Sequence, residues 1–192
     1  MKRLLVIFCI LIFSLVTFSA TRHTYVDQSV LSDGKFVNYS YKDFYNTVIG
    51  LALAFKELNV QKGENVALIS DNRREWLLAD MGLLSLGAVD VPRGYDSMAR
   101  EITYIISFSN CRIAIFENEK QLYKITESDA EMPELKTAIL FDCGNKAEAE
   151  EKAKAKNLNV ILFSELLEKA ATLVTPESKK AIEDGMNDIE PN

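Results

Sequence analysis

Histidine and cysteine are scarce in this chain of 192 residues. His23 is the only histidine, so a Ser-His-Asp or Cys-His catalytic arrangement would have to use that one residue. The three cysteines, Cys9, Cys111 and Cys143, lack the paired spacing of a zinc or redox motif. These shortages argue against triad-type hydrolases and against a metal site built from cysteines.

Clustered glycine and excess basic charge are also missing. The eight glycines are scattered, and Gly82 with Gly87 lacks the Lys-Ser/Thr that completes a P-loop. Triphosphates are held by many closely spaced backbone N–H groups, so the chain carries no recognisable phosphate-binding loop. The formal net charge is -6 and no basic stripe is present, which excludes the usual kind of nucleic-acid binder.

The first twenty residues have the plan of a targeting segment. Lys2 and Arg3 give a basic start, Leu4–Phe18 forms a long apolar centre, and Ser19 and Ala20 are small. Residues 1–20 are therefore predicted to be a signal peptide or a membrane anchor, and membrane association is expected. Three alternatives stay open: a cleaved signal, an uncleaved anchor, or a leader that arose by chance or by a frameshift.

The stretch from residue 65 onward begins with a strand and a helix. Val66–Ile69 is a β-branched apolar run typical of a buried strand. Asp71 or Asn72 is placed to cap the helix that follows, and Glu75 has the position of a capping-box carboxylate.

The same stretch continues into a second strand and a polar loop. Gly87 would end the helix in a left-handed conformation, Ala88–Val91 would form the strand, and Pro92 would close it. The loop Arg93–Ser97 then lies where open α/β sheets usually place their sites. For the charged loop residues Arg93 and Asp96, we expect solvated, structural roles rather than substrate contacts.

Strands and helices alternate along the rest of the chain. A hairpin is predicted around Ser32–Lys35, and Ser40 opens a helix with an apolar face from Tyr41 to Leu58. This alternation predicts an α/β fold with a doubly wound, largely parallel sheet and flanking helices. Further strands are expected at Arg112–Phe116, Thr137–Phe141 and Asn159–Phe163, and further helices begin near Ser97 or Asp96, Glu117, Lys146, Ser164 and Thr175.

Several of these segments carry a family resemblance. The run VALISDNRREWLLADMGLLSLGAVDVPRGYDS closely resembles the N-terminal region of AMP-forming acyl-CoA synthetases, especially long-chain fatty-acid:CoA ligases of the adenylate-forming superfamily. Asn38–Phe44, Leu58–Glu64 and Glu101–Ile106 also follow the family pattern. The resemblance covers residues 25–192 as a partial AMP-binding domain, the N-terminal domain of an acyl-CoA synthetase, and is most specific from Asn38 to Glu117.

The resemblance implies an acid-thiol ligase. The intact family enzyme activates a fatty acid with ATP and Mg to an acyl-adenylate and passes the acyl group to CoA. The family's Thr-Ser-Gly-Thr-Thr-Gly-x-Pro-Lys-Gly loop, its magnesium-coordinating glutamate, its ribose-binding aspartate and its catalytic lysine have no counterpart here. No catalytic, cofactor-binding or metal residue is therefore assigned. We expect this chain to be an N-terminal fragment that binds no cofactor and is inactive alone.

A second hypothesis belongs to another class of protein. An exported or membrane-tethered α/β module, without enzymatic activity, would use the same domain as a binding surface. The family is otherwise cytoplasmic, whereas the apolar leader favours the membrane, so localisation is left open between them. The fragment hypothesis further predicts apolar helix faces and a sheet edge exposed where the rest of a larger domain would cover them.

Overall fold

A computed structural model describes residues 24–30 and 36–189 of the chain. The predicted leader 1–20, His23, Cys9 and the hairpin turn Ser32–Lys35 lie outside the described residues. Among the helices that are described, none combines the length and the apolar composition needed to traverse a bilayer.

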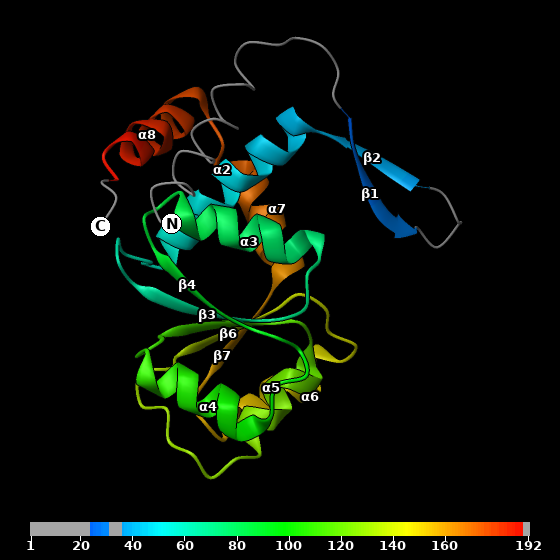
Figure 1. The fold of residues 1–192 in the computed structure, drawn as a ribbon, viewed down its shortest axis with the longest axis vertical. Coiled ribbons are helices and arrows are strands. Elements are labelled where there is room, and N and C mark those ends of the chain that lie inside the picture. Colours follow the sequence, from blue (N-terminus) through cyan, green and yellow to red (C-terminus); the bar gives the residue numbers. More distant parts are fainter. Residues whose placement is uncertain (1–23, 31–35, 190–192) are drawn as a thin grey trace.

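The first two strands form the predicted hairpin. The strands β1 (Thr24–Val30) and β2 (Phe36–Ser40) pair in antiparallel fashion and stand to one side of the main body (Figure 1). The Arg74 guanidinium carbon lies 3.8 Å from the centroid of the Tyr39 ring, which links the end of β2 to helix α3 (Arg74–Leu84). This cation–π contact holds the hairpin near the body.

The core of the fold is a five-stranded parallel sheet in the order β4-β3-β5-β6-β7. Every pair of neighbouring strands is parallel, so each connection crosses over through a helix. This confirms the predicted α/β fold with a largely parallel sheet. The strands are β3 (Asn65–Ile69), β4 (Val89–Arg93), β5 (Ile113–Phe116), β6 (Thr137–Leu140) and β7 (Asn159–Leu162).

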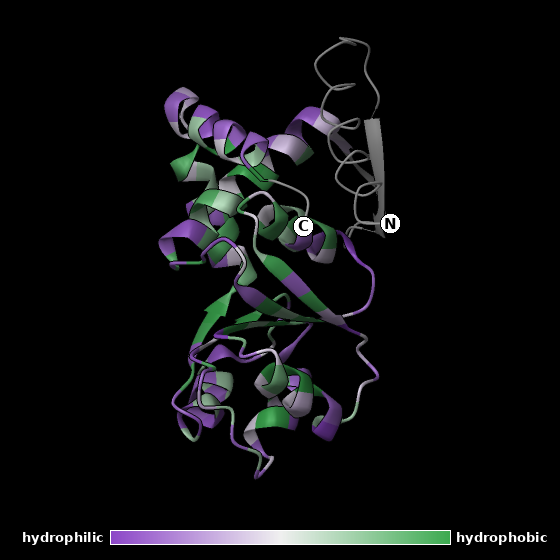
Figure 2. Ribbon diagram, turned by 60° about the vertical axis from the view of Figure 1, so that its left-hand side comes forward, coloured by the Kyte–Doolittle hydropathy of each residue, from purple (hydrophilic) through white to green (hydrophobic). Residues whose placement is uncertain are grey.

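Helices cover both faces of the sheet, as a doubly wound fold requires (Figure 1). One side carries α3 together with α2 (Tyr41–Glu57), α7 (Phe163–Leu173) and α8 (Pro176–Asn187). The other side carries α4 (Ala99–Phe108), α5 (Glu119–Thr126) and α6 (Lys146–Lys154). Figure 2 shows that the strands are largely hydrophobic and that the outer helix α8 is largely hydrophilic.

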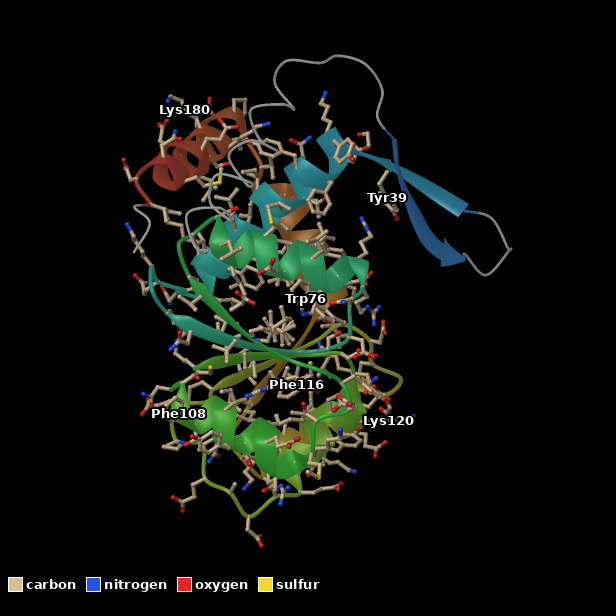
Figure 3. The ribbon with its side chains drawn as sticks, in the orientation of Figure 1. Tyr39, Trp76, Phe108, Phe116, Lys120 and Lys180 are labelled. Carbon is tan, nitrogen blue, oxygen red and sulfur yellow. The ribbon has the colours of Figure 1, made fainter. Side chains whose placement is uncertain are left out.

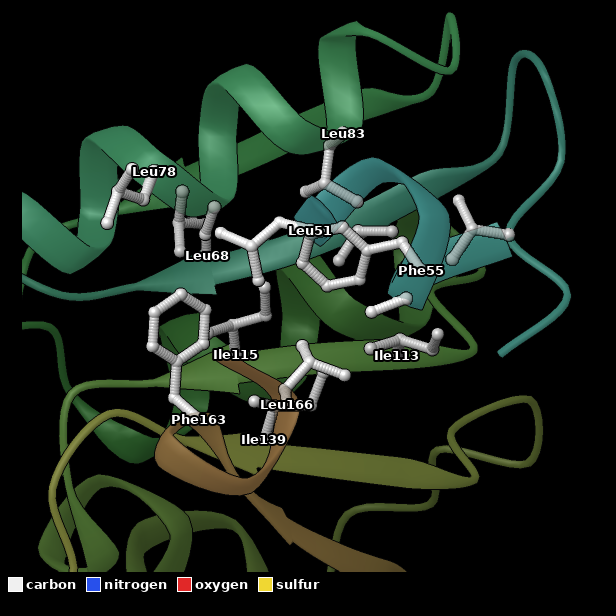
Figure 4. Close-up of a cluster of buried hydrophobic side chains, with 14 of the residues drawn as sticks. Leu51, Phe55, Leu68, Leu78, Leu83, Ile113, Ile115, Ile139, Phe163 and Leu166 are labelled. Carbon is white, nitrogen blue, oxygen red and sulfur yellow. The ribbon is translucent and has the colours of Figure 1, made fainter. Parts of the chain in front are cut away.

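Alternate strand residues build two separate cores. Val66, Leu68 and Ile115 pack against α2, α3 and α7, with Phe55 and Phe163 among the side chains they meet (Figure 4). The residues between them face the other way and pack against α4, α5 and α6. These are Ala67, Ile69, Ala114, Phe116, Ala138 and Leu140. A shift of any strand by one residue would exchange the two cores, so the register is strongly specified.

Helix α2 begins as the sequence predicts. The Ser40 hydroxyl accepts a hydrogen bond from Asp43 N at 3.1 Å, and the Asp43 carboxylate accepts one from Ser40 N. The apolar face is buried from Val48 to Phe55, but Tyr41 is 48% exposed. The prediction that the buried face begins at Tyr41 was therefore wrong, whereas Phe44, nearly one turn later, packs against the core.

The predicted cap of α3 is also corrected. Neither Asp71 nor Asn72 caps this helix, whose N-cap position is Arg73. The Glu75 carboxylate binds Arg73 Nε at 2.7 Å instead of a free helix N–H group, and Asp71 Oδ1 accepts from Tyr95 N at 3.3 Å. Glu75 is thus engaged by a nearby guanidinium, and Asp71 by a backbone group 24 residues away that the local pattern could not reveal.

Pro92 does not close β4 but lies inside it, on the edge of the sheet. Val89 N donates to Glu64 O, and Arg93 O accepts from Ser70 N, so Val89, Val91 and Arg93 form the bonds to β3. Pro92 occupies an alternate position whose backbone faces outward, where a missing N–H group costs nothing. A proline at this position also discourages pairing with another strand.

Two further helix starts differ from the prediction for one reason. Helix α4 is capped at Met98 rather than at Ser97 or Asp96, and α7 starts at Phe163, ahead of Ser164. In each case the carboxylate three residues after the cap accepts the cap's backbone N–H, from Met98 to Glu101 and from Leu162 to Glu165. The carboxylate half of a capping box is therefore present at both helix starts, without a hydroxyl at the cap position.

Candidate functional site

The carboxyl ends of the parallel strands meet at one edge of the sheet, where α/β proteins place their sites. Ser70 follows β3 and is 5% exposed. Its hydroxyl donates to Glu117 Oε2 at 3.0 Å, and Asp71 N donates to the same oxygen at 2.9 Å. Glu117 follows β5, so its carboxylate ties the ends of two neighbouring strands together.

Arg73 makes a second connection across this edge. Its Nη1 and Nη2 lie 2.5 and 3.3 Å from the two carboxylate oxygens of Asp142, which follows β6. Burial alone would lower the pKa of Arg73, but the bonds to Asp142 and Glu75 outweigh it and raise the pKa. The guanidinium carbon also lies 5.5 Å from the centroid of the Phe141 ring. Arg73 therefore remains a cation whose donors are directed at neighbouring side chains.

The loop Arg93–Ser97 is fixed through its backbone. Tyr95 N donates to Asp71, and Lys124 Nζ donates to Tyr95 O and Ser97 O at 3.2 and 2.8 Å. The side chains of Arg93 and Asp96 are exposed, as expected for solvated residues. Sequence reasoning missed Glu117 and Asp142, although a polar residue directly after each buried strand was the signal that could have found them.

An open pocket of about 510 Å³ lies at the ends of β6 and β7, beside the start of α5. A second pocket, of about 20 Å³, lies elsewhere, between the end of α4 and the loop around Pro133. Charged and polar groups from separate elements face it. The lining residues are Asn118, Glu119, Lys120, Phe141, Asp142, Cys143, Gly144, Leu162 and Ser164.

The residues around this pocket do not fit a nucleoside triphosphate. Helix N-termini can bind phosphate through free N–H groups, but here a cap side chain already accepts from one N–H group in the first turn of α5 and of α6. Asn118 accepts from Lys120 N, and Asn145 accepts from Glu148 N. The carboxylates of Glu119 and Asp142 would repel phosphate oxygens. Within the described residues, no group of three or more His, Cys, Asp or Glu side chains could hold a metal ion.

Neither Cys143, which lines this pocket, nor Cys111, which is buried elsewhere, is an activated nucleophile. Partial burial raises the pKa of the Cys143 thiol, with the nearby Glu119 carboxylate adding to the shift. Burial raises the pKa of Cys111 to about 11. Because the thiolate is the reactive form, both thiols are protonated and unreactive near neutral pH.

A half-buried pair of carboxylates lies between α3 and the edge strand. Asp90 stands beside Val66 in the register, so it faces α3, and Asp80 comes from α3 itself. Burial, followed by the charge of Asp90, raises the pKa of Asp80 to about 7. Burial also raises the pKa of Asp90. This pair therefore lowers the free energy of unfolding at neutral pH.

Replacing Asp80 with asparagine should stabilise the chain at pH 8. The folded carboxyl keeps its proton up to about pH 7, whereas the unfolded one loses it near its ordinary value of 3.8. Asp80 therefore costs stability progressively as pH rises from about 4 to 7, and the cost is constant above that range. After allowance for partial exposure, we expect Asp80→Asn to add on the order of 1 to 3 kcal/mol at pH 8.

Urea unfolding at pH 4 and pH 8 would measure this effect. The same substitution at the exposed Asp129 is the matched control, and it should change little at either pH. An Asp80→Asn gain that is equal at both pH values would show that the carboxyl is not neutral in the folded chain.

Comparison with known proteins places these observations in a family. The model of a family described as AMP-binding enzyme matches residues 18–184. A long-chain-fatty-acid–[acyl-carrier-protein] ligase of Arabidopsis thaliana, AEE15, is 31% identical over 102 residues, which are 53% of this chain and 14% of that protein. The long-chain-fatty-acid–CoA ligase FadD15 of Mycobacterium tuberculosis is 27% identical over 115 residues, which are 60% of this chain and 19% of that protein.

Solved structures share the fold. The adenylation domain of a carboxylate reductase from Mycobacterium chelonae aligns with a TM-score of 0.62 at 16% identity, over 80% of this chain and 26% of that one. Coronafacic acid ligase from Pectobacterium brasiliense aligns with a TM-score of 0.57 at 20% identity, over 69% of this chain and 25% of that one. The chain thus spans about a fifth or less of the two curated relatives and about a quarter of these structures. The resemblance predicted from the sequence is confirmed: the chain belongs to the AMP-binding enzyme family.

Proposed function

We propose that this chain is a scaffold portion of a ligase that activates long-chain fatty acids through an acyl-adenylate. The family match supports adenylate-forming chemistry, and the names of AEE15 and FadD15 support a long-chain fatty acid as the substrate. In the intact enzyme, ATP with Mg would activate the acid, and CoA would receive the acyl group. Those ligands would be held by residues beyond this chain.

One observation gives the main support for the scaffold role. Several polar groups at the carboxyl edge of the sheet are bound to one another, as Arg73 is to Asp142 and Ser70 is to Glu117. Transfer of an adenylyl group needs donors directed at the developing charge on the phosphate. Groups already engaged by carboxylates cannot supply them without breaking those bonds. Residues 1–192 would therefore position the rest of an active site without performing its chemistry.

The test is an assay of pyrophosphate release by the full chain with ATP, Mg and palmitate. We expect no release above that of a protein-free blank, because the chain has no phosphate-binding loop. FadD15 of Mycobacterium tuberculosis, assayed in parallel, is the positive control. Release that rises in proportion to the concentration of this chain would refute the scaffold role.

The leader favours a second candidate function. Lys2 and Arg3 before the apolar run Leu4–Phe18 fit an exported or membrane-tethered module that binds a partner and has no enzymatic activity. Membrane association is therefore proposed on the sequence alone. Mass spectrometry of the mature N-terminus, with fractionation of the producing cells, distinguishes the cases. A mature chain that begins after residue 20 and appears in the medium would favour this candidate over the scaffold role.

A further inference from the structure

Helix α4 turns two aromatic rings away from the sheet. Tyr104 is 62% exposed and Phe108 is 70% exposed, and their ring centroids are 5.5 Å apart. Ile102 and Ile106, on the opposite side of the helix, are buried. Figure 3 shows Phe108 on α4, on the side of the sheet opposite Trp76. A stacked, exposed aromatic pair is unusual on a face that meets only water.

Val89, on the edge strand, is a further exposed apolar residue on this face of the sheet. Asn65 Nδ2 donates to Ser109 O at 2.9 Å, so the Asn65 side chain reaches the C-terminal end of α4. Val89 is the register partner of Asn65 and shares its face of the sheet. Val89 is 45% exposed. We call Val89, Tyr104 and Phe108 the α4 surface.

The two helical layers differ in how they are covered. On the side of α2, the outer helix α8 adds a further layer through the cluster of Ile49, Ala52 and Ile182 (Figure 1). On the side of α4, α5 and α6, no second layer is present among residues 24–30 and 36–189. The exposed aromatic pair lies on this single layer.

We propose that the α4 surface packs against the remaining part of an AMP-binding enzyme. This inference rests on the proposed function. The matched residues make up 19% of FadD15 and 26% of the reductase adenylation domain, so similar chains carry a large further portion. Contact through side chains is favoured over an added strand, because Pro92 and the half-buried Asp90 obstruct pairing at the edge of β4.

A chimera tests the proposal without relying on binding strength. In FadD15, the portion that corresponds to residues 24–189 of this chain is replaced by those residues, which keeps the β1–β2 pair and covalently joins the scaffold to the rest of a family enzyme. Tyr104 should react readily with tetranitromethane in the full chain alone, and about tenfold more slowly in the chimera, because packing would cover it. Tyr41, also an exposed aromatic residue on a helix, should react about equally in both.

Substitution gives a second readout. The double variant Tyr104→Glu/Phe108→Glu should leave the melting temperature of the isolated chain nearly unchanged, because both side chains are exposed. It should lower the melting temperature of the chimera, whereas Tyr41→Glu should not. Equal nitration of Tyr104 in both proteins, or an unaffected chimera, would overturn the proposal. A dimer of the full chain that the double variant dissociates would also overturn it, since the occupant would then be a second copy.

The chimera distinguishes an error in this inference from an error in the proposed function. A chimera that releases pyrophosphate but leaves Tyr104 fully reactive would retain the function and refute the α4 surface. A folded chimera that is inactive while Tyr104 is protected would retain the surface and refute the function.

Discussion

Replacing Phe55 with alanine should lower the free energy of unfolding by about 3 to 5 kcal/mol. Phe55 is fully buried, and its ring lies among Leu51, Leu83 and Ile113 (Figure 4). The ring also lies close to α3, since a Cβ atom on Gly82 would be 3.2 Å from Phe55 Cε2. Loss of the ring would leave a cavity between α2, α3 and the sheet, because the surrounding backbone is fixed by five paired strands.

Thermal and urea unfolding would measure this loss, expected as a fall of about 10 °C in the melting temperature. Phe108→Ala removes the same group at a position that is 70% exposed, so it should change stability by less than about 0.5 kcal/mol. Similar effects at the two positions would contradict the assignment of Phe55 to the core on the α2 side of the sheet.

Replacing Gly50 with alanine should destabilise the chain by about 1 to 3 kcal/mol. Helices α2 and α7 approach closely at this position, and a Cβ atom would come within 2.8 Å of the backbone oxygen of Ala170. A backbone atom cannot move aside as a flexible side chain can, so one helix must shift. That shift would disturb the packing of Phe163 and Leu166, which join α7 to the same core.

Gly185→Ala is the matched control for Gly50→Ala. Gly185 lies in α8, and a Cβ atom there would meet nothing within 4 Å. Because alanine favours the helix more than glycine does, this change should stabilise the chain by about 0.5 to 1 kcal/mol. Urea unfolding of both variants should therefore give shifts of opposite sign. A stabilising Gly50→Ala would show that α2 and α7 are further apart than described.

Much of the fold could be predicted because local patterns agree with the packing. The apolar run Val66–Ile69 and the left-handed glycine at Gly87, with φ of 69°, are both where the sequence places them. The Thr175 cap with Pro176 at the start of α8 is also confirmed. In each of these segments, neighbouring residues are enough to determine the backbone.

Some of the errors occur where a distant residue decides. Asp71 or Asn72 was expected to cap α3, but the Asp71 carboxylate is engaged by the backbone of Tyr95, which is 24 residues away. The pairing of Arg73 with Asp142 spans 69 residues, so no local window could predict it. The pocket beside Asp142 depends on the same long-range order. The prediction that no residue of this chain is catalytic rests on missing motifs and stays a prediction.

Pyrophosphate release by the FadD15 chimera tests the central claim most directly. If residues 24–189 are a scaffold of the AMP-binding family, they should replace the corresponding portion of FadD15, and the chimera should release pyrophosphate from ATP in the presence of palmitate. The full chain alone should not. A folded chimera with no palmitate-dependent release, or equal release by the chain alone, would contradict the account.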